Sequence, residues 1–336
     1  MRVAAFTDFG DGDDVEIQER PDPEPGPEEA VIDVEACSIN RHDLWILQGD
    51  SAMVTDGALP FVSGLDAAGI VREAGDRAAV AEGDRVLLCP NQTCGTCEFC
   101  REGPETHCKQ FMLYHGALAE QALVDASRLI PLPDSVGFRE AAALPTAYLT
   151  AWRMLDVADT GPRDLVFIPG ATGGVGVAAV QLAEVLGAET IGTSTSRRKL
   201  ARLEELGCDS TIQSADPDEL VHEVRGIGDV DVVINHLAGE FTQAGLEVMD
   251  RAGTMVICGR TAGGESSFEV APFFLQHQEI VGSTMGTQPE LETLVELLAE
   301  GAFDPPVGDT YTLDETGAAF DDMIERDAFG KLIVEP

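Results

Sequence analysis

The sequence predicts an α/β protein in which a β-rich domain precedes a doubly wound parallel sheet. The first observation is a change of pattern near Phe138. Before it, short β-branched runs are broken by Gly, Pro and Asp, as in small antiparallel sheets. After it, apolar strand candidates alternate with helical stretches, which is typical of a parallel sheet covered by helices. The second observation is length, since 336 residues exceed what one hydrophobic core usually organises.

Each expected element follows from a local run of the sequence. In the first domain, β-branched runs predict strands at residues 30–36, 69–73 and 84–89. In the second, apolar runs predict strands at 165–168, 190–193, 230–235, 254–258 and 279–282, with helices that include 177–186 and 198–206. A helix at 291–300 and a closing strand at 331–334 are expected in the tail.

Four cysteines with regular spacing form the most informative motif. The spacing is C-x2-C-x2-C-x7-C, from Cys94 through Cys97 and Cys100 to Cys108. Thiolates at this spacing can converge on one tetrahedral ion, so the motif predicts a closed, structural zinc site with one Zn²⁺ per chain. Unrelated thiols or a disulfide pair are the alternative.

The other four cysteines carry no motif. They are Cys37, Cys89, Cys208 and Cys258, and we expect them to be buried structural thiols.

A glycine-rich turn follows the strand expected at 165–168. It contains Gly170, Gly173, Gly174, Val175 and Gly176, and a helix is expected directly after it. Glycines at a strand-to-helix turn let the backbone approach a pyrophosphate, whose charge the helix N-terminus receives. The context of strand, turn and helix therefore predicts a dinucleotide site.

The end of the next strand predicts which dinucleotide binds. No acid stands about twenty residues after the glycines, where a ribose-binding Asp or Glu marks an NAD site. The segment instead offers hydroxyls and cations that suit a 2′-phosphate, at Ser194, Ser196, Arg197, Arg198 and Lys199. NADP(H) is the expected cofactor and NAD(H) the less favoured one; a helix start with solvated cations is the alternative.

Acidic residues dominate the charge. The chain has 60 Asp and Glu against 21 Lys and Arg, a net charge of -39. Carboxylates spread along the whole chain predict a halophile's protein from a salt-rich cytoplasm, and they disfavour nucleic acid as a partner. The N-terminal residues lack the apolar core of a signal peptide. No apolar run approaches the roughly 20 residues that span a bilayer, so no membrane partner is expected.

These motifs together resemble the medium-chain dehydrogenase/reductase superfamily, which holds zinc alcohol dehydrogenases and zinc-free quinone and enoyl reductases. Besides the cysteine run, the similar segments are 36–45 (ACSINRHDLW), 60–69 (PFVSGLDAAG), 83–86 (GDRV), 144–152 (LPTAYLTAW), 170–176 (GATGGVG) and 329–334 (FGKLIV). The resemblance implies a GroES-like catalytic domain at 1–135 with a zinc lobe at 89–110, a Rossmann NADP-binding domain at 136–285, and a return of 286–336 to the first domain. It also implies a homodimer or homotetramer.

The resemblance further implies that the catalytic zinc of the alcohol dehydrogenases is absent. Its three ligands align with Asn40, Leu65 and Thr146, which are poor or incapable ligands. Asp66 could bind a metal, but one carboxylate does not make a site. Catalysis would then rest on a nicotinamide hydride and on hydrogen-bond donors that stabilise a developing oxyanion.

Three residues are the candidate catalytic groups: Asn40, His42 and Asp66. His42 aligns with the hydroxyl of the zinc enzymes' proton relay and could donate to an enolate or phenolate oxygen. The alternative is a histidine bonded to the cofactor ribose or to Asp43. Asn40 could orient a substrate carbonyl, or be a loop residue that satisfies backbone groups.

Three further residues complete the predicted cofactor-binding set: Thr150, Cys258 and Gly259. The histidines without motif context are expected to be structural: His115, His222, His236 and His277.

The sequence thus favours an NADPH-dependent, catalytically zinc-free reductase of a small-molecule quinone or α,β-unsaturated carbonyl. Two alternatives stay open. One is an alcohol dehydrogenase, reducing an aldehyde or ketone, with an atypical metal set that includes His42 and Asp66. The other is a non-catalytic NADPH-binding redox sensor.

We predict that folding needs high salt. Excess carboxylates repel one another in dilute buffer, whereas at molar salt the Debye length falls to about 3 Å. The melting temperature should therefore rise with KCl, and dialysis into dilute buffer should unfold the chain or dissociate its subunits. Calorimetry at matched NaCl concentrations controls for specific K⁺ binding. A melting temperature independent of KCl would contradict the prediction.

Overall fold

The computed structural model describes residues 1–51 and 56–336. They form two compact units. Unit 1 contains Met1–Thr146 and Thr287–Pro336, and unit 2 contains Ala147–Gly286. The C-terminal segment therefore belongs to the same unit as the N-terminus.

Unit 2 is built on a six-stranded, fully parallel sheet. Its strand order is β12-β11-β10-β13-β14-β15. The strands are β10 (Leu165–Ile168), β11 (Glu189–Thr193), β12 (Ser210–Ile212), β13 (Val230–Asn235), β14 (Met249–Ile257) and β15 (Glu279–Gly282). The order reverses between β10 and β13, and such a switch point is where doubly wound sheets bind ligands.

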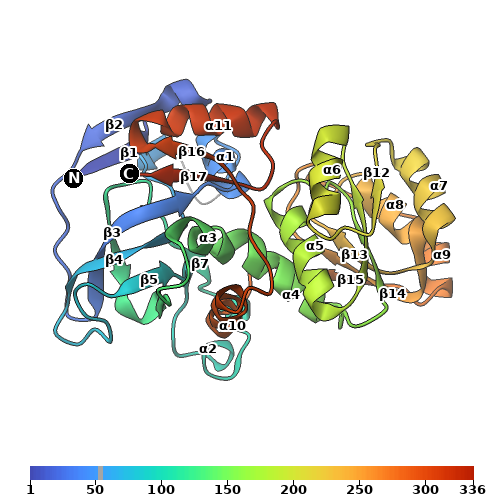
Figure 1. Cartoon of the computed structure of the whole chain (residues 1–336), viewed down its shortest axis with the longest axis horizontal. Helices are drawn as coiled ribbons and strands as arrows, with labels where there is room; N and C mark the ends of the chain where they lie inside the picture. The colour runs from blue at the N-terminus through green and yellow to red at the C-terminus, as the bar shows by residue number, and fades with distance from the viewer. Residues whose placement is uncertain (52–55) are drawn as a thin grey trace. The chain divides into compact units, whose positions relative to one another are not determined.

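Helices cover both faces of this sheet. In Figure 1, α4, α5 and α6 lie on one side of it and α7, α8 and α9 on the other. Their bounds are α4 (Leu149–Val157), α5 (Gly174–Leu186), α6 (Arg197–Glu205), α7 (Pro217–Ile227), α8 (Phe241–Val248) and α9 (Val270–Leu275). The predicted Rossmann-type doubly wound fold is confirmed.

The predicted strands differ from the structure at two places in unit 2. The short strand β12 was not predicted, because only Ile212 of its three residues is apolar and buried. Strand β14 begins at Met249 and ends at Ile257, so Cys258 lies just after the strand rather than in it.

Unit 1 is the predicted β-rich, GroES-like part. Seven strands form its main sheet, in the order β16-β17-β3-β4-β5-β9 with β8 also paired to β3. These strands are β3 (Glu29–Ser38), β4 (Asp66–Ala74), β5 (Arg85–Leu88), β8 (Gln121–Asp125), β9 (Leu129–Pro131), β16 (Val307–Thr312) and β17 (Lys331–Glu335). Two small sheets pair β1 (Arg2–Phe6) with β2 (Val15–Glu19) and β6 (Asn91–Gln92) with β7 (Met112–Leu113).

The helices of unit 1 are short. They are α1 (Arg41–Leu47), α2 (Glu98–Glu102), α3 (Phe138–Ala142), α10 (Gln288–Ala299) and α11 (Thr316–Glu325). Single 3₁₀ turns occur at η1 (Gly12–Asp14), η2 (Asp56–Ala58), η3 (Glu105–His107), η4 (Ala126–Arg128) and η6 (Leu313–Glu315), and η5 (Leu144–Tyr148) is a π-helical turn at the boundary of the units.

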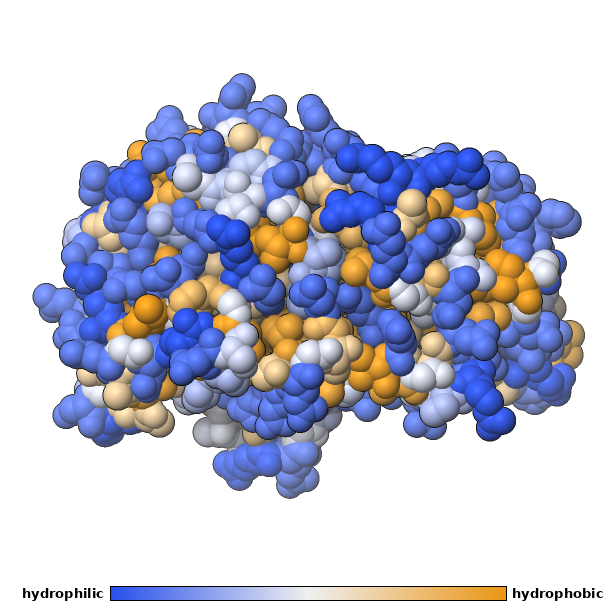
Figure 2. Space-filling model, viewed as in Figure 1, coloured by the Kyte–Doolittle hydropathy of each residue, from blue (hydrophilic) through white to orange (hydrophobic). Residues whose placement is uncertain are grey.

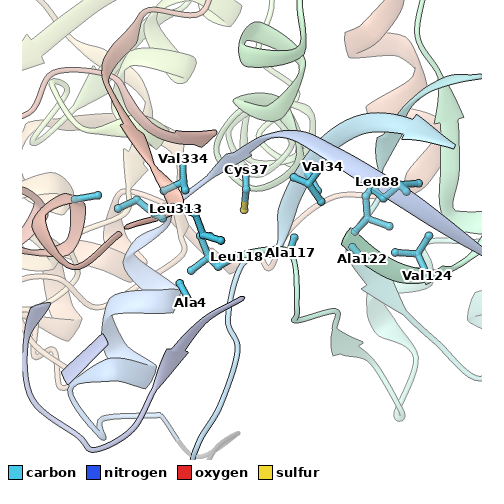
Figure 3. Close-up of a cluster of buried hydrophobic side chains, with 14 of the residues drawn as sticks. Ala4, Val34, Cys37, Leu88, Ala117, Leu118, Ala122, Val124, Leu313 and Val334 are labelled. Carbon is cyan, nitrogen blue, oxygen red and sulfur yellow. The ribbon is translucent and has the colours of Figure 1, made fainter. Parts of the chain in front are cut away.

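Strand β3 organises the core of unit 1, because it pairs with β4, β8 and β17. Its side chains Val34 and Cys37 lie among residues of β5, β8 and β17 (Figure 3). Cys37 is fully buried, and Cys89 and Cys208 are buried too, as predicted, whereas Cys258 is only half-buried because it lies just after the end of β14. These contacts fix β3, and with it the residues that follow its carboxyl end.

The surface is largely hydrophilic on the face that Figure 2 shows. In the described part of the chain, no helix is long and apolar enough to cross a membrane.

Candidate active site

The glycine-rich turn joins β10 to α5 in unit 2. Gly170 has a φ of +70°, a conformation that favours glycine. A Cβ on Gly176 would lie 2.5 Å from the Cα of Ala171, so only glycine allows this close packing of helix on turn. Gly173, Gly174 and Val175 at the start of α5 are not buried. Their N–H groups, which have no intrahelical acceptor, can therefore receive an anion.

Hydroxyl groups cluster beside this turn, at the end of β11. The Thr172 and Ser194 hydroxyls are 3.1 Å apart, and the backbone N–H of Ser196 donates to Ser194 Oγ. Arg197 and Arg198 are exposed at the start of α6. The structure thus brings the predicted 2′-phosphate residues next to the predicted pyrophosphate residues, within one unit.

Lys199 differs from the two arginines because it is buried, only 7% exposed. Its backbone N–H donates to Ser196 Oγ, which caps α6.

The remaining predicted cofactor residues lie on other segments of unit 2. Thr150 is buried on α4, and its hydroxyl donates to Met285 Sδ. Cys258 is half-buried, and burial raises its pKa to about 12. Gly259 has a φ of +77°, and a Cβ there would lie 2.8 Å from the carbonyl oxygen of His236. Gly259 therefore suits a close approach of backbone segments.

The four cysteines of the zinc motif converge in unit 1. Their sulfur atoms all lie within 4.8 Å of one another, with Cys94 and Cys100 at 3.8 Å. Zn–S bonds of about 2.3 Å give tetrahedral edges of about 3.8 Å, so the cluster fits a zinc ion. Backbone N–H groups of Thr96 and Cys97 donate toward Cys94 and lower its pKa to about 5, which favours the thiolate that a metal requires.

A second polar cluster surrounds Asp66, which is fully buried at the start of β4. Its Oδ2 accepts from Ser38 Oγ and Asn40 Nδ2, both at 2.9 Å. Its Oδ1 accepts from Thr146 Oγ1 at 2.6 Å. Ser38 is the last residue of the core strand β3, and Asn40 comes two positions later. Thr146 lies in the π-helical turn η5. Both carboxylate oxygens therefore already have protein donors.

A buried ion pair completes this cluster. Lys331 Nζ, at the start of β17, lies 3.6 Å from Asp66 Oδ2, and the two side chains are 5% and 0% exposed. Burial raises the pKa of Asp66 and lowers that of Lys331, and each charge opposes the effect of burial on the other. Lys331 also donates to Asn40 Oδ1 and to the Ile39 carbonyl. The ammonium of Lys331 thus pairs with the Asp66 carboxylate, which a metal at this place would need as a ligand.

Asn40 was predicted as a candidate donor to substrate, but its amide is occupied. Nδ2 donates to Asp66 and to the Ser38 carbonyl, and Oδ1 accepts from Lys331. Asn40 and Asp66 lie together, and both are held by protein groups. Among the described residues, the cysteine cluster is the one group of three or more His, Cys, Asp or Glu side chains that could hold a metal.

His42 is the predicted catalytic residue with a polar atom still available. Its Nε2 is buried without a hydrogen-bond partner. Asp43 accepts from Ser63 Oγ, the Gly64 N–H and the Asn40 N–H, and no hydrogen bond joins it to His42. Burial lowers the pKa of His42.

His115, which lacks sequence context and was expected to be structural, stacks on His42. The ring centroids are 5.5 Å apart and the planes differ by 20°. The sequence could not indicate a role for His115, because this histidine belongs to no motif and lies far from His42 in the sequence.

Arg41 is a second residue that the sequence did not single out. It is half-buried and has no ion pair with the residues that the structure describes, although the chain is rich in carboxylates. Burial lowers its pKa, and the nearby charge of Arg326 lowers it further.

Comparison with known proteins agrees with this geometry. Residues 26–134 match the model of the alcohol dehydrogenase GroES-like domain, and residues 174–300 match that of zinc-binding dehydrogenases. The chain is 29% identical over 328 residues to an acryloyl-coenzyme A reductase of Sulfurisphaera tokodaii, covering 95% of this chain and 96% of that one.

Solved structures resemble the whole chain. One, an NAD-dependent alcohol dehydrogenase, has a TM-score of 0.91 and 31% identity and covers 100% of both chains. Another is a 2-octenoyl-CoA carboxylase reductase in complex with NADP and 2-octenoyl-CoA, with a TM-score of 0.88 and 25% identity, covering 99% of this chain and 87% of the other.

The chain therefore belongs to the zinc-type medium-chain dehydrogenase/reductase superfamily. It is an NAD(P)-dependent oxidoreductase, so the alternative of a non-catalytic sensor finds no support.

We predict that the buried pair is needed for stability. Lys331→Met leaves the Asp66 carboxylate buried and uncompensated, which typically costs roughly 3–5 kcal/mol. Adding Asp66→Asn removes the unpaired charge, so the double variant should recover part of the loss. Urea unfolding at constant salt measures the free energy of unfolding of the single and the double variant. Lys109→Met, at an exposed position, is the control. Equal stability of Lys331→Met and Lys109→Met would contradict the prediction.

Proposed function

We propose that the chain is an NADPH-dependent reductase that works without a catalytic metal and reduces a small-molecule α,β-unsaturated carbonyl or quinone. The observation that carries this proposal is the pairing of Asp66 with Lys331. A simple ketone needs a strong electrophile such as zinc to accept a hydride. A conjugated acceptor needs less, because its negative charge is delocalised as it develops.

The dinucleotide would be held by the groups described in unit 2. The turn from Gly170 to Gly176 and the start of α5 suit the pyrophosphate, and Ser194, Ser196 and Arg197 suit a 2′-phosphate. When bound, NADPH supplies a hydride. The similarity to an acryloyl-coenzyme A reductase and to a 2-octenoyl-CoA carboxylase reductase supports an unsaturated acceptor.

His42 is the proposed catalytic residue. For an unsaturated carbonyl, the β carbon takes the hydride and the electron pair of the C=C bond moves toward the carbonyl oxygen. An N–H of the neutral His42 ring donates to that oxygen and stabilises the enolate. A proton from water at the α carbon completes the reduction. Asn40 and Asp66 are proposed as positioning residues, because they hold the start of α1, where His42 lies.

The alcohol dehydrogenase alternative requires a metal at His42 and Asp66. Both oxygens of Asp66 accept hydrogen bonds from protein groups, which argues against it.

A substrate panel with NADPH tests the proposal. We expect turnover with enoyl thioesters, enones or quinones, and much slower turnover with saturated ketones and aldehydes. Exhaustive chelation should leave the rate per folded chain unchanged, because no catalytic metal is involved. Alcohol oxidation that is lost on chelation and restored by a divalent metal would instead support the atypical dehydrogenase.

We predict a preference for NADPH over NADH of at least about tenfold, equivalent to about 1.4 kcal/mol. One charge-assisted bond to the 2′-phosphate suffices for this. Replacing Arg197 and Arg198 by Ala should weaken NADPH binding and barely change NADH binding, as measured by fluorescence titration at constant salt. Arg225→Ala on α7 is the control. A wild-type preference for NADH would refute the assignment.

We also propose that the cysteine cluster binds zinc at about one ion per chain, as structural sites of this type do. Cys97→Ser should lose the metal and lower the melting temperature, because metal binding contributes folding free energy. Cofactor affinity of the folded fraction should stay nearly unchanged. Elemental analysis checks the metal, with Cys208→Ser, a cysteine outside the cluster, as the matched control; two ions per wild-type chain would contradict a single structural site.

Self-association is proposed for unit 2. Helix α9 exposes Val270, Phe274 and Leu275 at 64%, 58% and 61%, close in sequence to β15, the last strand of the parallel sheet. An exposed apolar segment and an edge strand in the same unit support a homodimer or a homotetramer.

A further inference from the structure

Two histidines from distant parts of unit 1 face each other. His42 comes from α1, and His115 from the segment between β7 and β8. Phe61 packs against His115, with the ring centroids 5.2 Å apart at an angle of 63°. Two imidazoles stacked at 5.5 Å and bounded by an aromatic edge form a compact site of polar and aromatic groups.

Three ring nitrogens of this pair are buried without any hydrogen-bond partner among the described residues. They are His42 Nε2, His115 Nδ1 and His115 Nε2. A buried polar atom left without a partner typically costs about 1–3 kcal/mol. Native proteins rarely keep several such atoms together unless a ligand or water satisfies them. A purely structural histidine would be expected to bond at least one of its two nitrogens.

The pair is uncharged near neutral pH. Burial lowers the pKa of both rings, that of His115 to about 4, against the smaller opposing influence of Asp43. Asp43 itself is held by Ser63, Gly64 and the Asn40 N–H. Each neutral ring offers one N–H donor and one acceptor nitrogen. The site therefore presents hydrogen bonds without a positive charge, close to a buried acid.

We propose that His115 is a second substrate-contacting residue and that the His42–His115 pair selects neutral acceptors, such as α,β-unsaturated thioesters, esters, amides and ketones, over the free carboxylates. This rests on the proposed function. A carbonyl oxygen needs one or two donors and brings no net charge. A carboxylate would enter a buried site without a cation to balance it and near the negative Asp43, which is strongly unfavourable. Two donors also stabilise an enolate oxygen better than one.

Substitution of His115 tests the contact. His115→Phe keeps the ring against His42 and Phe61 but removes both nitrogens, whereas His115→Gln keeps a donor and an acceptor. We expect His115→Phe to raise the KM for a neutral enoyl substrate at least tenfold while the KM for NADPH stays constant, and His115→Gln to recover much of the loss. His222→Phe, at an exposed position on α7, is the control. An unchanged acceptor KM in His115→Phe would overturn the proposal.

Selectivity is tested by binding, independently of turnover. Calorimetry on the wild type, loaded with a redox-inert tetrahydro analogue of NADPH whose nicotinamide ring is neutral, compares crotonamide with crotonate, which share a carbon chain and differ in charge. We expect at least tenfold weaker binding of crotonate and a smaller ratio in His115→Phe. Equal affinities for the two probes in the wild type would overturn the proposal.

Ring ¹⁵N NMR supplies a readout that a structural role would not move. The chain has six histidines, so each ring signal can be assigned by substitution. Crotonamide should shift the signals of both His42 and His115. Movement of His42 alone would limit the contact to one residue and overturn the assignment of His115.

The proposed function and the proposed role of His115 are refuted by different results. If the panel shows no reduction of any acceptor but crotonamide binds and shifts both rings, the proposed function is wrong and the His42–His115 site stands. If acceptors are reduced and His115→Phe behaves as wild type, the function stands and the inference fails.

Discussion

The buried pair of Asp66 and Lys331 is the interaction on which the site of unit 1 depends. Neither charge is tolerable alone at this depth, and both are balanced by each other and by Ser38, Asn40 and Thr146. This arrangement fixes the amide of Asn40, whose backbone in turn binds Asp43 at the start of α1. The position of His42 follows from that chain of contacts, which the Asp66–Lys331 pair holds together.

Much of the fold could be predicted because its signals are local. The apolar runs at 165–168, 230–235 and 279–282 coincide with β10, β13 and β15, since each is short, β-branched and bounded by turn residues. Strand β12 was not predicted, because its three residues, Ser-Thr-Ile, do not form an apolar run. The cysteine spacing likewise predicted a cluster that the structure brings together.

The candidate site of unit 1 could be predicted only in part, because its contacts are between distant residues. Alignment with the family indicated that Asn40, Leu65 and Thr146 are poor metal ligands. It did not indicate which residues bind the side chains of Asn40 and Asp66 instead. The partner of Asn40 is Lys331, 291 positions away. The role of His115 could not be predicted for the same reason, since only the folded chain places its ring against that of His42. Local sequence patterns therefore predict helices and strands, whereas the contacts of the candidate site form between residues that are distant in the sequence.

The location of Lys331 on the last strand has a consequence for biosynthesis. Strand β17 pairs with β3, so Lys331, which is translated after all of unit 2, must reach a carboxylate that is translated before unit 2. Until β17 leaves the ribosome, Asp66 lacks the ammonium of Lys331 and unit 1 is incomplete. Unit 2 is a continuous stretch of the chain and has no such requirement. Nascent chains that end before β17 would therefore carry a finished sheet in unit 2 beside an unfinished unit 1, and premature termination at any codon before that of Lys331 would leave the site unassembled.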